Sequence, residues 1–285
     1  MVLTHLNVVI GYGTFITSRR QYESGPIMNY TIGNLSLNVE EKGEGDPALV
    51  FLHYWGGSHR TWNGVISRLA DTFRCVAYDS RGWGKSEAPA SGYSMTDLAD
   101  EASSLIQTLG LTKYVLVGHS MGGKVAQLLA SRNPIGLVGL ILVAPATPTP
   151  THFPEEALQQ QLHAYDNRET VVQTMRFLSA KTPSPEMLEQ IVEDSLSGSL
   201  AATIAWPTLG IVEDISSEVS KIAVPTLVLA GEHDNLDSVE QHRREVLPRI
   251  ANAQLEVIAG SGHLIPIDEP EQLTLAVSRF VSQLS

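Results

Sequence analysis

Ser120 occupies the centre of the pentapeptide Gly118-His119-Ser120-Met121-Gly122, which matches the pattern G-x-S-x-G. An apolar run, 114–117, precedes it and a helix-like stretch, 124–132, follows it. Between a strand and a helix this pattern forms a sharp turn that lifts the serine hydroxyl clear of the backbone, and the flanking glycines allow that turn. The residue after the serine opens the helix, so its N–H has no helical partner and faces a developing oxyanion. The pattern predicts a nucleophile at Ser120 and an oxyanion donor at Met121.

A serine hydroxyl is a weak nucleophile until a base takes its proton, and a third group must hold that base in the right tautomer. In a parallel sheet such groups belong at the carboxyl ends of strands. Of the nine histidines, His263 fits best, because it follows a strand-like run, 255–258, and a glycine-containing turn, 260–262. We therefore expect His263 to be the base.

The acid is expected at Asp234, which lies in the short turn that follows the apolar run 225–230. The other strand end where an acid could lie, after Ala144, is followed by Pro-Ala-Thr and offers no carboxylate. Glu232 and Asp237 are the alternative acids in the same loop, and a purely structural role for Asp234 is the remaining alternative. The sequence favours Asp234 over these.

The second oxyanion donor is expected from the loop that follows the apolar run 48–52, most simply the backbone N–H of Trp55. The Trp55 side chain would line the pocket at the same time. Tyr54, Trp206 and Leu264 are expected to contact the substrate, and Trp206 can equally serve only in packing. The inserted segment 146–221, with Trp206 and several leucines, predicts a modest, largely apolar substrate rather than a polymer.

The chain alternates strand-like and helix-like segments up to residue 145 and again from 222 to the end. Such alternation predicts a mostly parallel sheet with helices on both faces. The stretch 146–221 has no strong strand, several prolines at its start and amphipathic segments, so we expect an inserted helical cap there. Residues 26–145 and 222–285 would form the core, and residues 1–25 an N-terminal arm of uncertain role.

Composition limits the classes of function. Hydrophobic residues make up 43% and charged residues 18% of the 285 residues, as in an ordinary globular protein. The net charge of −12 makes nucleic acid and anionic membranes poor partners. The one cysteine, Cys75, is expected to be a buried core thiol. No apolar run approaches a membrane span and the first residues make a weak signal peptide, so we expect a cytoplasmic protein.

Several other residues are expected to be structural. Lys124 lies one helical turn after Ser120, but a structural amine is favoured over a Ser–Lys pair because His263 is available. Asp79 and Arg81 are expected to stiffen a loop, and His119 to be wedged against the sheet. His152 and His163 are expected at the surface, since no carboxylate cluster accompanies them. We therefore expect neither a metal nor a cofactor.

The chain resembles the α/β-hydrolase superfamily, in its esterase-like branch with a helical cap. The matching motifs extend from about residue 34 to the end, outside the cap, and they are His53 with Gly56-Gly57, the segment 79–86, the segment 118–123, Gly231-Glu232-His233-Asp234, and Gly262-His263 with Glu269-Pro270. The resemblance implies the α/β-hydrolase fold and a triad in the chain order Ser120, Asp234, His263. One position departs from the family pattern: Tyr54 stands where a glycine is usual, and its β-carbon restricts the backbone of the oxyanion loop.

These observations predict a serine hydrolase that cleaves a small ester-type substrate through an acyl-enzyme on Ser120. Lactone hydrolysis, carbon–carbon bond hydrolysis and perhydrolysis remain alternatives on the same triad. A ligand-binding sensor without turnover is the alternative from another class. A serine at position 120 disfavours dehalogenase and epoxide-hydrolase chemistry, which need a carboxylate nucleophile.

Overall fold

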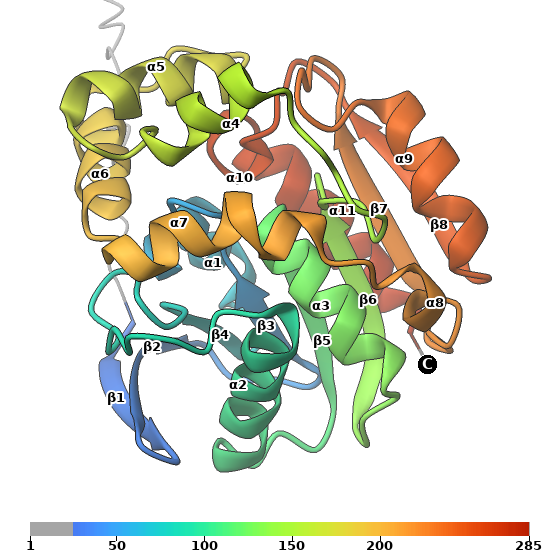
Figure 1. Ribbon diagram of the computed structural model, residues 1–285. Coiled ribbons are helices and arrows are strands. Elements are labelled where there is room, and N and C mark those ends of the chain that lie inside the picture. The colour runs from blue at the N-terminus through green and yellow to red at the C-terminus, as the bar shows by residue number, and fades with distance from the viewer. Residues whose placement is uncertain (1–24, 285) are drawn as a thin grey trace, which may run out of the picture.

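A single mixed sheet runs through the computed structural model, which describes residues 25–284. Its eight strands lie in the spatial order β1-β2-β4-β3-β5-β6-β7-β8 (Figure 1). The strands are β1 (Ile27–Ile32), β2 (Leu35–Lys42), β3 (Ala48–Leu52), β4 (Cys75–Tyr78), β5 (Tyr114–His119), β6 (Leu137–Val143), β7 (Thr226–Gly231) and β8 (Ala253–Ile258). β1 and β2 pair antiparallel, as do β2 and β4, and every other neighbouring pair is parallel. The predicted mostly parallel sheet is confirmed; of the predicted N-terminal arm, residues 1–24 lie outside the described residues.

Helices cover both faces of this sheet because the central strands are buried on both sides. In β3, Leu49 and Phe51 face one core, whereas Val50 and Leu52 face the other, as the two-residue period of a strand requires. The first core contains α1 (Asn63–Leu69) and α11 (Pro270–Ser282), which pack against each other. The second contains α2 (Met95–Thr108) and α3 (Met121–Ser131). The remaining short helices of the core are η1 (His59–Trp62), α8 (Ser216–Val219), α9 (Val239–Glu245), η3 (Leu247–Arg249) and α10 (Ile265–Asp268).

Local capping sets the bounds of α2. Ser94 caps α2 by accepting from the Asp97 N–H, while the Asp97 carboxylate accepts from the Ser94 N–H. The helix ends just before Gly110, whose φ of 63° suits a glycine after a helix. This capping fixes where α2 starts and stops on the sheet.

Between β6 and β7 the chain forms helices that lie over the carboxyl ends of the parallel strands (Figure 1). We call this group the cap; it consists of α4 (Glu155–Leu162), α5 (Arg168–Leu178), α6 (Pro185–Leu196), α7 (Leu200–Thr208) and η2 (Gly210–Val212). Among residues 25–284 no single helix is long and apolar enough to cross a membrane, and only α6 together with α7 and η2, bent by 88°, reaches the required length and composition. The cap therefore covers the edge of the sheet at which the predicted site residues follow the strands.

Candidate active site

Ser120 links the end of β5 to the start of α3, and its backbone is left-handed, with φ at 54°. Glycines on either side make this turn possible. A β-carbon on Gly122 would lie 2.5 Å from the Leu52 carbonyl oxygen, and one on Gly118 would lie 2.4 Å from the Gly122 carbonyl oxygen. No side chain fits at either position, so the predicted sharp turn depends on both glycines.

The structure brings Ser120, His263 and Asp234 into one hydrogen-bonded row. The His263 ring contacts the Ser120 Oγ through Nε2, at 2.8 Å, and the Asp234 Oδ2 through Nδ1, also at 2.8 Å. Ser120 follows β5, Asp234 follows β7 and His263 follows β8, so three strand ends supply the three groups. An imidazole that donates from Nδ1 and accepts at Nε2 is arranged to take a proton from the serine.

Backbone groups fix the Asp234 carboxylate. Its Oδ1 accepts from the N–H groups of Leu236, at 2.8 Å, and Asp237, at 3.0 Å, which leaves Oδ2 directed at His263. Burial alone would raise the pKa of Asp234, but the charge and hydrogen bond of His263 and these two N–H groups lower it. Burial would likewise lower the pKa of His263, but the Asp234 charge and hydrogen bond raise it above its ordinary value. The two residues therefore form a mutually stabilising buried pair.

The alternative acids lie elsewhere in the loop. Glu232 is exposed, and its Oε2 accepts from the Gly260 N–H at 2.9 Å. Asp237 is buried, and its Oδ1 accepts from the Gln241 side chain at 3.0 Å. Within residues 25–284, the one carboxylate hydrogen-bonded to His263 is that of Asp234.

The loop after β3 fixes the direction of the Trp55 N–H through the contacts of the Tyr54 carbonyl. The Tyr54 carbonyl accepts from His53 Nδ1 at 2.7 Å and from the Gly57 N–H at 3.0 Å. Because the peptide unit is planar and trans, the Trp55 N–H points opposite to that carbonyl. No partner for this N–H is found in the described part of the chain, and the Met121 N–H opens α3. Both N–H groups are therefore available, and their role as the oxyanion donors stays a prediction.

His53 has a positioning role that the sequence motif alone did not reveal. The buried ring accepts from the Ser80 N–H at Nε2, at 3.0 Å, so its proton lies on Nδ1 and is donated to the Tyr54 carbonyl. Burial lowers the pKa of His53, which keeps the ring neutral and this tautomer available. A histidine directly after a fully buried strand is the sequence signal that marks it.

His119 and the cap hold the backbone of His263 from opposite sides. The His119 Nε2 donates to the His263 carbonyl at 2.8 Å, and the His263 N–H donates to the Leu178 carbonyl, at the end of α5, at 2.7 Å. Burial and the nearby His263 ring lower the pKa of His119 to about 3, so His119 stays neutral. This neutral ring orients the loop of His263, in agreement with the wedged position predicted for it.

A small cavity lies beside Met121, under α7. Its volume is about 10 Å³, room for a single water molecule, and its wall includes Trp83, Met95 and Trp206. Tyr54 and Leu264 lie instead in a buried cluster with cap residues of α5 and α6. The Tyr54 ring packs on the His119 ring, with centroids 5.1 Å apart. Trp206 therefore borders the cavity, whereas Tyr54 and Leu264 support the triad from the side, and their contact with substrate stays a prediction.

Lys124 points away from the serine. Its Nζ donates to the carbonyls of Glu213, at 2.6 Å, and Ile211, at 3.2 Å, at the end of the cap. Burial lowers the pKa of this amine to about 8. Lys124 thus ties α3 to the segment between η2 and α8. Among the described residues, no group of three or more histidine, cysteine or acidic side chains is arranged to hold a metal ion.

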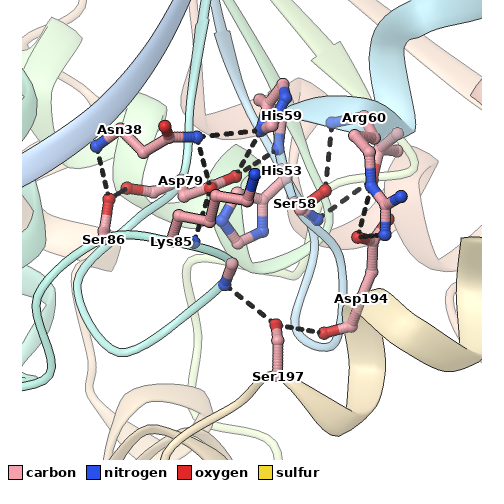
Figure 2. Close-up of polar contacts among 12 residues, drawn as sticks. Asn38, His53, Ser58, His59, Arg60, Asp79, Lys85, Ser86, Asp194 and Ser197 are labelled. Carbon is pink, nitrogen blue, oxygen red and sulfur yellow. Dashed lines mark hydrogen bonds and ion pairs between the residues drawn. The ribbon is translucent and has the colours of Figure 1, made fainter. Parts of the chain in front are cut away.

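Asp79 organises a buried polar network next to the site (Figure 2). Its Oδ1 accepts from the N–H and from the Nδ1 of His59, both at 2.7 Å, and its Oδ2 accepts from the Asn38 side chain and the Lys85 N–H, both at 2.9 Å. Burial would raise the pKa of Asp79, but its bonds to His59 and Lys85 lower it to about 2. This network joins β2, the segment after β3 and the loop after β4, and it makes no contact with the triad that the described residues show.

We expect Asp79→Ala to lower the free energy of unfolding by about 3–5 kcal/mol, because it leaves the buried His59 ring, the Asn38 amide and two backbone N–H groups without their acceptor. Urea-induced unfolding measures this. The folded pKa lies below the ordinary 3.8, so the stabilisation is present above that pH and is lost as the pH falls towards about 2. Asp100→Ala, which breaks the exposed Arg132 pair, is the matched control and should cost less than about 1 kcal/mol. Equal losses in the two variants would contradict the role of the network.

Comparisons with known proteins agree with this architecture. Residues 49–276 match the model of the alpha/beta hydrolase family. The 2-(acetamidomethylene)succinate hydrolase of Mesorhizobium japonicum is 28% identical over 88% of this chain and 93% of its own length. The 3-oxoadipate enol-lactonase 2 of Acinetobacter baylyi is 26% identical over 90% and 96%. The solved structure of an esterase from Exiguobacterium antarcticum superposes with a TM-score of 0.82 at 26% identity, over 91% of this chain and 100% of that one. The chain therefore belongs to the alpha/beta hydrolase family, and the hydrolase class predicted from its sequence is confirmed.

Proposed function

We propose that this protein is a serine hydrolase that cleaves a small, largely apolar ester through an acyl-enzyme on Ser120. The observation that carries the proposal is the row in which His263 contacts Ser120 and Asp234 at 2.8 Å each. In this arrangement the imidazole removes the serine proton as Oγ attacks the ester carbonyl. The Asp234 charge then stabilises the imidazolium that forms.

The next steps use the same groups. The Trp55 and Met121 N–H groups are proposed to hold the oxyanion of the tetrahedral intermediate. The His263 imidazolium donates its proton to the alkoxy oxygen of the ester as the bond from that oxygen to the acyl carbon breaks, so an alcohol departs and the acyl group stays on Ser120. Water, activated by His263, then attacks the acyl-enzyme and releases the acid. The first proton transfer is between Ser120 and His263, which are already in hydrogen-bond contact.

The surroundings of Ser120 support a small apolar substrate. The cavity beside Met121 is walled mainly by apolar and aromatic side chains of α2 and α7. Ser120 and His263 are both buried beneath the cap, so a polymer chain could not reach them without a large displacement of the cap. Because the cavity holds only a single water molecule in this conformation, the site must open to admit a substrate, and a short acyl or alkoxy group requires the least opening.

A fluorophosphonate probe together with a panel of activated esters tests the proposal. We expect one equivalent of probe on Ser120 and turnover of short-chain esters, with lower rates for long acyl chains. A panel that also contains lactones, vinylogous diketones and hydrogen peroxide with an acyl donor separates ester hydrolysis from the other reactions of the triad. Stoichiometric labelling without turnover of any substrate would instead indicate a ligand-binding sensor, and absence of labelling would overturn the proposed nucleophile.

A further inference from the structure

The loop that carries the predicted Trp55 donor is anchored by three of its own carbonyl groups. The Tyr54 carbonyl is held within the core, by His53 and the Gly57 N–H. The next two carbonyls are held by the cap. Tyr165, between α4 and α5, donates its hydroxyl to the Trp55 carbonyl at 2.7 Å, and Ser195, in α6, donates its hydroxyl to the Gly56 carbonyl at 2.9 Å.

These bonds act on the donor through planar peptide units. The Gly56 carbonyl and the Gly57 N–H belong to the same peptide plane, so the Ser195 bond sets the direction of that N–H. The Gly57 N–H in turn donates to the Tyr54 carbonyl, which shares its plane with the Trp55 N–H. Fixing the Gly56 carbonyl therefore also fixes the direction of the Trp55 N–H, the predicted oxyanion donor.

Packing reinforces the contact between Tyr165 and the loop. The Tyr165 ring lies 4.4 Å from the Trp55 ring, centroid to centroid, and the Trp55 indole N–H donates to the Thr203 carbonyl of α7 at 3.2 Å. Gly56 has a φ of 93°, and a β-carbon there would lie 2.2 Å from the Tyr165 hydroxyl oxygen. The loop and the cap thus approach more closely than any side chain at position 56 would allow.

We propose that Tyr165 and Ser195 are positioning residues, through which the cap holds the loop 54–57 in the conformation that directs the Trp55 N–H at the oxyanion. This role rests on the proposed serine-hydrolase function. It makes the cap part of transition-state stabilisation, in addition to covering the substrate. Neither residue touches the reacting atoms; both act through the backbone of the loop.

Single-atom deletions test the proposal. Tyr165→Phe keeps the ring on Trp55 and removes only the hydroxyl, and Ser195→Ala removes only the bond to Gly56. For a short activated ester we expect kcat to fall about 10-fold in each variant while KM changes by less than about twofold, because a displaced donor weakens binding of the transition state more than of the substrate. Serine adds to the carbonyl of an aryl trifluoromethyl ketone and forms a tetrahedral adduct that carries an oxyanion. The affinity for this ketone should therefore fall by the same factor as kcat.

Ser197→Ala is the matched control for Ser195→Ala. Ser197 also lies at the end of α6, but its hydroxyl oxygen accepts from the Gly84 N–H at 2.9 Å and so ties the cap to a different loop (Figure 2). Tyr30→Phe, which removes a tyrosine hydroxyl bonded to Glu41 on the edge of the sheet, is the control for Tyr165→Phe. Both controls should keep kcat within about twofold of the wild type.

Each possible result has a distinct meaning. The proposal is supported if Tyr165→Phe and Ser195→Ala lose kcat and ketone affinity together while the controls do not. It is overturned if both variants keep kcat within about twofold, or if Ser197→Ala loses as much as Ser195→Ala, since that would indicate general loosening of the cap. If Ser195→Ala does not fold, as judged by circular dichroism, the conservative Tyr165→Phe decides alone. A wild type that neither turns over the ester nor reacts with a fluorophosphonate overturns the serine-hydrolase function itself, and the positioning role with it.

Discussion

Ser120→Ala should lower kcat for ester hydrolysis by about 10⁶-fold, because no other nucleophile among residues 25–284 is hydrogen-bonded to His263. The change keeps a β-carbon on a backbone with a φ of 54°, so the turn and the fold should be retained. Residual hydrolysis would come from the oxyanion donors and from binding alone. Pre-steady-state assays with an activated ester measure the loss, because the burst of leaving group should vanish.

The control for this variant is Ser131→Ala, at the other end of the same helix α3. The Ser131 hydroxyl donates to the Leu128 carbonyl at 2.8 Å, far along the helix from the triad. We expect its kcat to stay within about twofold of the wild type. A Ser120→Ala protein that still shows a burst, after titration to exclude contaminating wild-type enzyme, would mean that the nucleophile is another residue.

Asp234→Asn should lower kcat by up to ~10⁴-fold while the fold is retained. The asparagine amide can donate to His263 Nδ1, which places the ring proton on Nε2. A protonated Nε2 can no longer accept the serine proton.

The pH dependence of the reaction gives a second readout of the pair. The Asp234 charge raises the pKa of His263, and only neutral His263 acts as a base. In the wild type, kcat/KM should therefore rise with pH through a midpoint above the ordinary histidine value of 6.5. In the variant, the remaining activity should rise at a lower pH.

Glu232→Gln is the control for the acid, because Glu232 lies two residues earlier in the same loop and is exposed. Its kcat and the midpoint of its pH profile should match those of the wild type. If Asp234→Asn instead keeps a rate close to that of the wild type, the acid lies elsewhere, and buried Asp237 becomes the next residue to replace. The pH profile distinguishes this case, since the midpoint would then move only in Asp237→Asn.

The sheet and the convergence of the three triad residues could be predicted because they depend on local signals. Apolar runs such as β3 and β5 must be buried on both faces, and a parallel sheet brings their carboxyl ends together. Ser120 was marked by its flanking glycines, Asp234 by its position after the apolar run of β7, and His263 by the strand-like run of β8 and the glycine-containing turn before it. These features need no knowledge of how distant helices pack.

The contacts of the cap could not be predicted in the same way. Tyr165 and Ser195 are ordinary residues of amphipathic helices and loops, and no spacing in the chain marks them. Their partners are backbone carbonyls more than a hundred residues away, so their identity depends on how α5 and α6 settle on the core. Tyr54 and Leu264 illustrate the same limit, since their burial against α5 and α6 is decided by tertiary packing.

The left-handed backbone of Ser120 has an evolutionary cost. A non-glycine residue held at a φ of 54° is less stable than glycine there by about 1–3 kcal/mol. Replacing Ser120 by glycine would relieve the strain of the turn and raise the thermostability of the protein. It would also remove the hydroxyl that reacts. Serine is thus retained at position 120 for its activity although it lowers thermostability. Searches for heat-resistant variants should leave Ser120 unchanged.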